Sequence, residues 1–157
     1  MKILLLGIGN TLLTDEGVGL HVLQNLASGA PLPPEVEPLD GGTLSFTLAG
    51  PIQEADALIV VDAAQLNSEP GTWRLLRGEE MDAFLLGNRK SSVHEVGLTD
   101  LRAIAILAGH WPAQRAMLAV QPGLVDWGEQ PTQAVAAAVP EVAKAIRALV
   151  QEWLHEA

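Results

Sequence analysis

Two carboxylates and one imidazole stand where they could act together. Glu16 lies in the loop after the N-terminal apolar run, Asp62 follows the apolar run 57–61, and His94 precedes a predicted helix. These groups form an open, incomplete ligand shell that suits a borderline divalent ion such as nickel or zinc, shared with water or a substrate. Without a metal, the same trio could work as a general acid and base. Spacing alone does not choose between these two uses.

Strands and helices must alternate for these three side chains to meet. Residues 57–61 and residues 2–7, which are apolar after Lys2, form runs typical of parallel strands that are buried on both faces. Further strands are predicted at 35–39, 71–77 and 115–120, and helices at 17–26, 99–108 and from 132 onwards. The pattern predicts an α/β fold with a mostly parallel sheet and helices on both faces. Ligands of such sheets bind at the carboxyl ends of the strands.

The loop after the first predicted strand has two competing interpretations. It contains Gly7 and Gly9, but Leu12 stands where a dinucleotide-binding G-x-G-x-x-G loop needs its third glycine. Asp15 and Glu16 could equally be acids in the first turn of a helix, where the helix dipole favours them.

The other polar clusters have structural alternatives as well. The segment Asp40-Gly41-Gly42-Thr43 follows the predicted strand 35–39 and could be an ordinary turn. Asp62 could be a helix N-cap or a loop aspartate. A carboxylate at the end of a buried strand is nevertheless costly to desolvate unless it is paired or bound to a cation.

Composition excludes several classes of protein. The 157 residues fit one domain spanning 1–157, with 48% hydrophobic and 18% charged residues, which excludes a disordered chain. The formal net charge of −10 argues against binding nucleic acid or an anionic membrane. Because the chain has no cysteine, it has no disulfide, thiolate nucleophile or cysteine-bound metal. No apolar run is long enough for a signal peptide or a membrane helix, so we expect a cytoplasmic protein.

Five motifs stand in a fixed order along the chain. They are Gly7-Ile8-Gly9-Asn10-Thr11-Leu12-Leu13-Thr14-Asp15-Glu16-Gly17-Val18-Gly19, Asp40-Gly41-Gly42-Thr43, Ile59-Val60-Val61-Asp62-Ala63, Ser92-Val93-His94-Glu95-Val96-Gly97-Leu98 and Val120-Gln121-Pro122. Together they resemble the maturation endopeptidases of nickel–iron hydrogenases, above all the branch that processes uptake-type enzymes. The resemblance covers nearly the whole chain. The sequence departs from the family at Ser45, where a glycine is frequent, and at 129–132, where Leu-Ser is common.

The resemblance implies both a fold and a reaction. The family fold is a three-layer α/β/α sandwich around a five-stranded sheet with one antiparallel strand, for which 71–77 is the candidate. The reaction is a single cut that removes a short C-terminal tail from the hydrogenase large-subunit precursor after nickel insertion. The implied partner is that precursor, and the implied cofactor is the nickel that it carries. We expect a monomer that binds neither nucleic acid nor a membrane.

The resemblance also assigns roles to individual residues. Glu16, Asp62 and His94 match the family's nickel-contacting positions, and we expect all three to be catalytic. Water could be activated by a carboxylate, with Asp62 as the first choice, or by the metal as a Lewis acid. Substrate binding is expected from Asp40, Gly41, Gly42 and Thr43, with the backbone amides of the two glycines holding the substrate chain or the oxyanion.

Two other functional classes stay open at this level. One is a non-enzymatic nickel-checkpoint chaperone that binds the precursor without cutting it. The other is an unrelated nucleotide-binding α/β domain, which the missing third glycine at Leu12 argues against.

Overall fold

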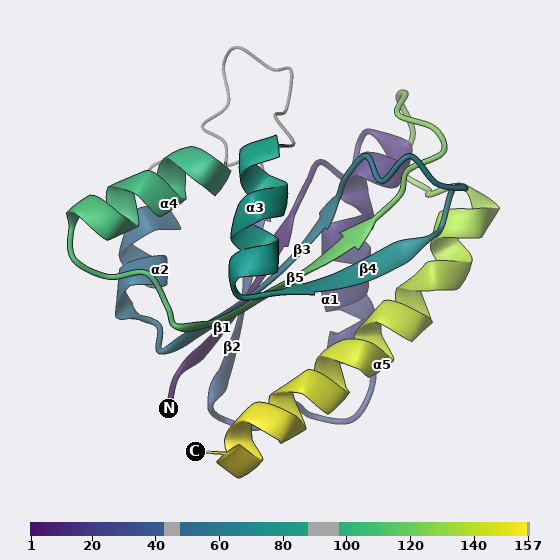
Figure 1. Cartoon of the computed structure of the whole chain (residues 1–157). Coiled ribbons are helices and arrows are strands. Elements are labelled where there is room, and N and C mark those ends of the chain that lie inside the picture. The colour runs from purple at the N-terminus through teal and green to yellow at the C-terminus, as the bar shows by residue number, and fades with distance from the viewer. Residues whose placement is uncertain (43–47, 88–97, 157) are drawn as a thin grey trace.

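A five-stranded sheet forms the middle of the molecule (Figure 1). The computed structural model describes residues 1–42, 48–87 and 98–156. The strand order is β2-β1-β3-β5-β4, and neighbouring strands are parallel except for β4 and β5. The strands are β1 (Ile3–Ile8), β2 (Val36–Gly42), β3 (Ala57–Ala63), β4 (Trp73–Arg77) and β5 (Gln114–Val120). The predicted α/β fold with a mostly parallel sheet is confirmed, as is the antiparallel strand expected within 71–77.

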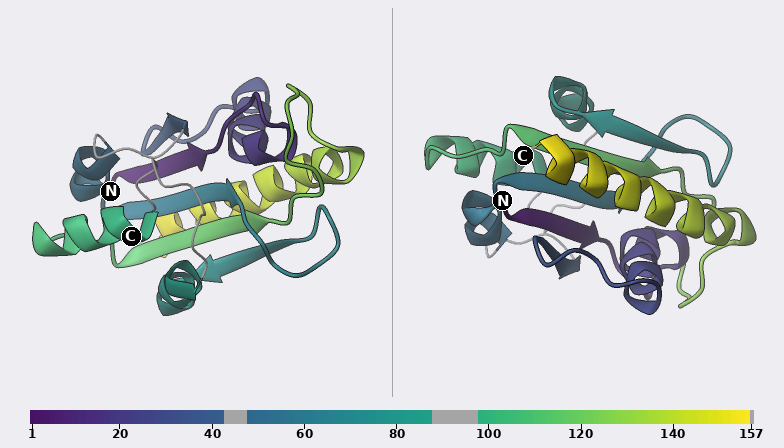
Figure 2. Two further views of the ribbon diagram at one scale, coloured as in Figure 1. Left: turned by 90° about the horizontal axis from the view of Figure 1, so that it is seen from above. Right: turned by 90° about the horizontal axis from the view of Figure 1, so that it is seen from below.

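Helices cover both faces of the sheet, as Figure 2 shows from two sides. One face carries α1 (Val18–Ser28) and α5 (Gln133–Glu156), and the other carries α2 (Ala49–Glu54), α3 (Glu79–Gly87) and α4 (Leu98–Leu107). The strand residues alternate between these two cores. In β3, Ile59 and Val61 join the core beneath α1 and α5, whereas Leu58 and Val60 join the other. No helix in the described ranges is long and apolar enough to cross a membrane.

Two strands extend further than the sequence pattern predicts. β2 continues through Asp40 to Gly42, and β3 continues through Asp62 to Ala63. These polar residues therefore belong to the strands and do not follow them. The reason lies in the backbone ladder, since Asp62 pairs with Ala119 of β5 whatever its side chain is.

Helix α3 has no counterpart among the predicted elements. Its first turn holds three acids, Glu79, Glu80 and Asp82, and Phe84, Leu85 and Leu86 are consecutive, so the helical period is weak. Tertiary packing supplies what the pattern lacks, because Met81 and Leu85 are buried in the core beneath α2 and α4.

Helix α1 lies very close to the ends of two strands. A Cβ at Gly19 would stand within 2.5 Å of the carbonyl oxygens of Ile8 and Val61, so only a hydrogen atom fits there. The chain before α1 is equally crowded. Gly9 has a φ of +131°, and a Cβ on it would overlap the carbonyl oxygen of Glu16. These approaches fix the short 3-10 helix η1 (Thr14–Gly17) at the carboxyl ends of β1 and β3.

A buried carboxylate ties η1 to the loop that joins β5 to α5. Asp15 is fully buried, and its carboxylate accepts four hydrogen bonds, from Gly123 N at 2.8 Å, Leu124 N at 3.0 Å, Thr132 N at 2.6 Å and Thr132 Oγ1 at 2.8 Å. The neighbouring Thr14 adds to this connection, because its hydroxyl donates to Leu124 O at 2.6 Å and accepts from Asp126 N at 3.1 Å. The loop and the turn therefore form one connected unit.

The hydrogen bonds decide the charge state of Asp15. Burial by itself would raise the pKa of this carboxyl. The backbone N–H groups of Leu124, Thr132 and Gly123 and the hydroxyl of Thr132 outweigh that effect, and the pKa is lowered below its usual value. Asp15 is thus an ionised group that binds the loop.

The close approach at Gly19 generates a stability prediction. Gly19→Ala should lower the free energy of unfolding by about 3 kcal/mol, because the new methyl group meets backbone oxygens that cannot move aside. Gly50→Ala is the matched control, since a Cβ at this helical position meets no atom within 4 Å outside its chain neighbours and its own helix backbone, and it should change stability by less than about 1 kcal/mol. Chemical denaturation measures both variants. Equal stability of the two would contradict the packing described for α1.

The ionised state of Asp15 generates a pH prediction. A carboxyl with a lowered pKa in the folded protein stabilises it at neutral pH, and this contribution disappears as the pH falls through that folded pKa, below about 4. Asp15→Asn should therefore cost roughly 2–4 kcal/mol at pH 7 and should flatten the loss of stability between about pH 5 and pH 2.

Asp126→Asn is the control for that experiment. Asp126 is exposed on the same loop, and its carboxylate accepts a hydrogen bond from Trp127 N at 2.8 Å that an asparagine oxygen can also accept. Thermal melts across this pH range report both effects. If Asp15→Asn loses stability with falling pH just as the parent does, another carboxylate controls acid unfolding.

Candidate active site

Asp62 lies at the carboxyl end of the central strand β3. It is only 4% exposed and is the last residue but one of the strand. The alternation along β3 places it on the same face as Leu58 and Val60, which is the face covered by α2, α3 and α4. A carboxylate in such an apolar setting interacts strongly with any cation that reaches it, because the local dielectric constant is low.

Glu16 reaches the same end of the sheet from η1. Its side chain is half-buried, in contrast to the fully buried Asp15 beside it. The backbone of η1 contacts β3. The carbonyl oxygen of Glu16 also lies so close to Gly9 that a side chain at position 9 would overlap it. Since Gly7 of β1 pairs with Val61 of β3, the chain leaves β1 level with Asp62 and turns directly into the segment that carries Glu16.

The structure therefore brings the elements that carry two of the three predicted residues together where β1 and β3 end. His94 lies outside the described residues. Its segment joins α3, which ends at Gly87, to α4, which begins at Leu98, and both helices pack on the face to which Asp62 belongs. Across residues 1–42, 48–87 and 98–156, no three histidine or acidic side chains form a metal-binding group. The trio with His94 stays a prediction.

The predicted substrate-binding segment lies on β2, at the edge of the sheet. Asp40 is exposed, and its Oδ1 accepts a hydrogen bond from Gly42 N at 2.8 Å. Gly42 has a φ of +50°, and its carbonyl accepts a hydrogen bond from Gly9 N at 2.9 Å. A Cβ at Gly41 would press against Leu6 Cδ1 at 2.9 Å, so the local structure favours glycine at both positions. Thr43 lies outside the described residues.

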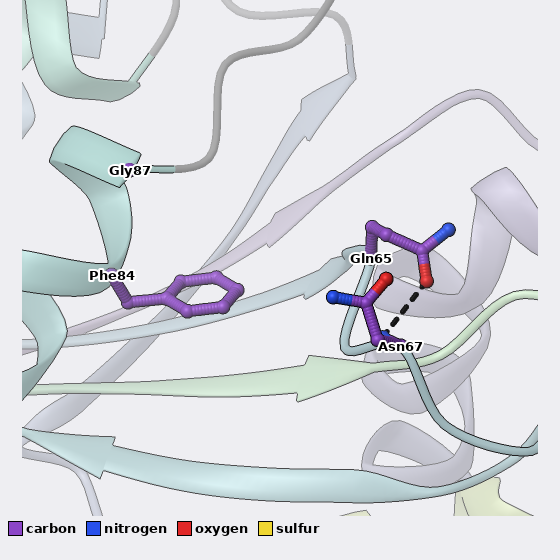
Figure 3. A pocket seen from close by; sticks show the side chains of 4 residues that line it. All are labelled: Gln65, Asn67, Phe84 and Gly87. Carbon is purple, nitrogen blue, oxygen red and sulfur yellow. Dashed lines mark hydrogen bonds between the residues drawn. The ribbon is translucent and has the colours of Figure 1, made fainter.

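A pocket at the end of β3 was not anticipated from the sequence. Gln65 and Asn67, which follow β3, and Phe84 and Gly87 of α3 line it. Figure 3 shows the Phe84 ring directed from α3 toward the two amide side chains, and Gln65 Oε1 accepting a 2.9 Å hydrogen bond from Asn67 N. Two polar residues shortly after a strand were the signal that could have identified this pocket.

General acid–base catalysis and metal binding are both possible at the carboxyl ends of β1 and β3. Either carboxylate at these strand ends can hold a proton or contact a cation. Both uses need a substrate at the carboxyl ends of the strands, which is where the ligands of such sheets bind.

Sequence comparisons relate this chain to known proteins. A family model described as hydrogenase maturation protease matches residues 20–149. The chain is 39% identical over 150 residues to the hydrogenase expression/formation protein HupD of Rhodobacter capsulatus, covering 94% of this chain and 71% of that protein. It is 39% identical over 123 residues to the hydrogenase 2 maturation protease of Escherichia coli K12, covering 78% of this chain and 74% of that protein.

A solved structure extends the likeness to the fold. The hydrogenase maturating endopeptidase HybD of Escherichia coli superposes with a TM-score of 0.89 at 35% identity, covering 97% of this chain and 93% of that one. These relatives favour an enzyme over the chaperone and nucleotide-binding alternatives. The chain therefore belongs to the hydrogenase maturation protease family and is an endopeptidase.

Proposed function

We propose that the protein removes the C-terminal tail of a nickel–iron hydrogenase large-subunit precursor after nickel insertion, and that it recognises the inserted nickel. The observation that carries the proposal is that η1, which bears Glu16, contacts β3, which bears Asp62 near its carboxyl end. Family membership supplies the substrate class. In this proposal the nickel belongs to the precursor and is part of the substrate.

Glu16, Asp62 and His94 contact the precursor's nickel in this proposal. Two carboxylates and an imidazole bind nickel while leaving coordination positions for the precursor's own ligands. Fixing the metal in this way also fixes the chain attached to it, so the peptide bond to be cut is held near the carboxylates. The low exposure of Asp62, 4%, strengthens its attraction for the metal.

Asp62 is the proposed base for the water that attacks the peptide bond. The water adds to the carbonyl carbon as its proton passes to the carboxylate, and that proton then goes to the leaving amine. Lewis-acid activation by the metal is the alternative route. A thiolate nucleophile from this chain is excluded, since the sequence has no cysteine.

The segment from Asp40 to Thr43 is proposed to bind the extended tail. β2 is an edge strand, so a peptide can add alongside it through backbone hydrogen bonds. The N–H of Gly42 already donates to Asp40, which favours a role in shaping the loop over a role as oxyanion donor. The pocket formed by Gln65, Asn67, Phe84 and Gly87 lies where a tail side chain could bind.

The remaining expectations are part of the same proposal. We infer that the protein acts as a cytoplasmic monomer and binds neither nucleic acid nor a membrane. The net charge of −10 supports the expectation about nucleic acid and anionic membranes, since it repels polyanions.

The site assignment predicts the effect of three substitutions. Glu16→Ala, Asp62→Ala and His94→Ala should each slow tail release from nickel-loaded precursor, with Asp62→Ala losing about 100-fold or more. Glu69→Ala, which removes an exposed acid from the segment after β3, should keep the parent rate. Mass spectrometry of the precursor measures the cut. If all three variants cut at the parent rate, the site lies elsewhere.

Nickel recognition predicts that the state of the substrate controls the rate. Parent protein should cut nickel-loaded precursor at least about tenfold faster than nickel-free precursor, because the metal supplies the contacts that position the chain. The two forms are prepared side by side and assayed at one concentration. If the protein cuts both forms of the precursor at equal rates, it is still an endopeptidase, but it does not recognise nickel.

A further inference from the structure

Two loops beside the candidate active site carry large apolar side chains on the surface. Leu12, Leu124, Val125 and Trp127 are 50%, 48%, 53% and 78% exposed. Single exposed apolar residues are common, whereas a group of them on neighbouring loops marks a contact surface. We refer to these four residues as the apolar platform.

Backbone hydrogen bonds hold the two loops side by side. Gly128 N donates to Leu12 O at 2.9 Å, and Thr14 N donates to Gly128 O at 2.7 Å. Leu13 and Gly128 also form an isolated β-bridge. Figures 1 and 2 show the loop between β5 and α5 alongside the turn that leads into α1. Leu12 therefore shares one surface with the loop that carries Trp127.

The platform is held in place before any partner arrives. The buried carboxylate of Asp15 accepts hydrogen bonds from the backbone of Gly123 and Leu124, and the hydroxyl of Thr14 bonds Leu124 O and Asp126 N. A surface that is already ordered loses little conformational freedom on binding. Tryptophan is also among the residue types enriched at the positions that carry most binding energy in protein interfaces.

We propose that the apolar platform docks the folded body of the hydrogenase precursor. This inference rests on the proposed function, because it takes the precursor as the substrate. Leu12 precedes Glu16 by four residues in one turn, so a body bound to the platform lies next to the edge where its tail is cut. The platform then contributes to substrate affinity, while the strand ends perform the chemistry.

Charge around the platform identifies the partner's surface. Asp126 and Glu129 are exposed on the same loop, and the whole chain carries a net charge of −10. Two copies of this chain joined through the platform would bring these acids together, which is repulsive. The complementary surface is an apolar patch bordered by lysine or arginine on the precursor.

The test separates binding from chemistry. Parent protein, Trp127→Ala and Leu107→Ala are compared for their Kd toward purified nickel-loaded precursor and for the KM and kcat of tail release. Leu107, on α4, is the matched control because it is 88% exposed and lies outside the platform. Trp127→Ala should raise Kd and KM by about tenfold or more and should leave kcat within about twofold. Leu107→Ala should match the parent.

A charge variant provides a second measurement on the same surface. Glu129→Lys should weaken precursor binding by about fivefold at low salt, and the difference should shrink as salt is added. Both effects follow from a basic rim on the partner. Tighter binding by Glu129→Lys would show an acidic rim and overturn the assignment.

Each remaining outcome decides the proposal. Unchanged Kd and KM in Trp127→Ala, or an equal loss in Leu107→Ala, overturns it. The proposal is also overturned if sedimentation shows that the parent is a dimer, that Trp127→Ala dissociates it, and that precursor binding is unchanged. In that case the platform binds a second copy of this chain. If the parent binds the precursor without cutting it, the proposed function fails. The Kd comparison then still shows whether the platform binds the precursor. If the parent does not bind the precursor, both fail.

Discussion

The buried carboxylate of Asp15 is the interaction on which this end of the molecule depends. Its hydrogen bonds join η1 to residues more than a hundred positions later in the chain, from Gly123 to Thr132. Hydrogen bonds to a charged group are worth more than neutral ones, and a buried charge without them is strongly destabilising. The carboxylate and the loop therefore require each other. The position of Glu16, the next residue, follows from that of Asp15.

Adjacent acids can have opposite tasks because of the local geometry. In a 3-10 turn, successive side chains diverge by roughly 120°, so two neighbours cannot face the same way. Asp15 points into the protein and is fully buried, and Glu16 is half-buried at the strand ends. The crowding at Gly9 and Gly19 holds this turn against β1 and β3, so that one residue serves the fold and its neighbour lies where a substrate can approach.

The sequence predicted the sheet well and the turn only in part. Continuous apolar runs identify β1 and β3, because a parallel strand buried on both faces leaves no other pattern. Among nineteen acids, the strand-end rule then points to Asp62 and to the pair Asp15 and Glu16. The same rule could not separate Asp15 from Glu16, since the partners of Asp15 come from a distant loop. Helix α3 and the pocket beside Phe84 were missed for the same reason, because packing between distant segments creates both.

The proposed function places an unusual requirement on ligand chemistry. A protein that recognises a metal held by its substrate must contact that metal without removing it. Thiolates would compete for nickel, whereas carboxylate and imidazole bind it less strongly and leave it with softer ligands. The chain has no cysteine, so it brings no thiolate to the site. If metal contacts are kept weak in this way, affinity for the precursor has to come from elsewhere on the surface. The proposed docking surface, whose Leu12 precedes Glu16 by four residues, adds affinity without adding contacts to the metal.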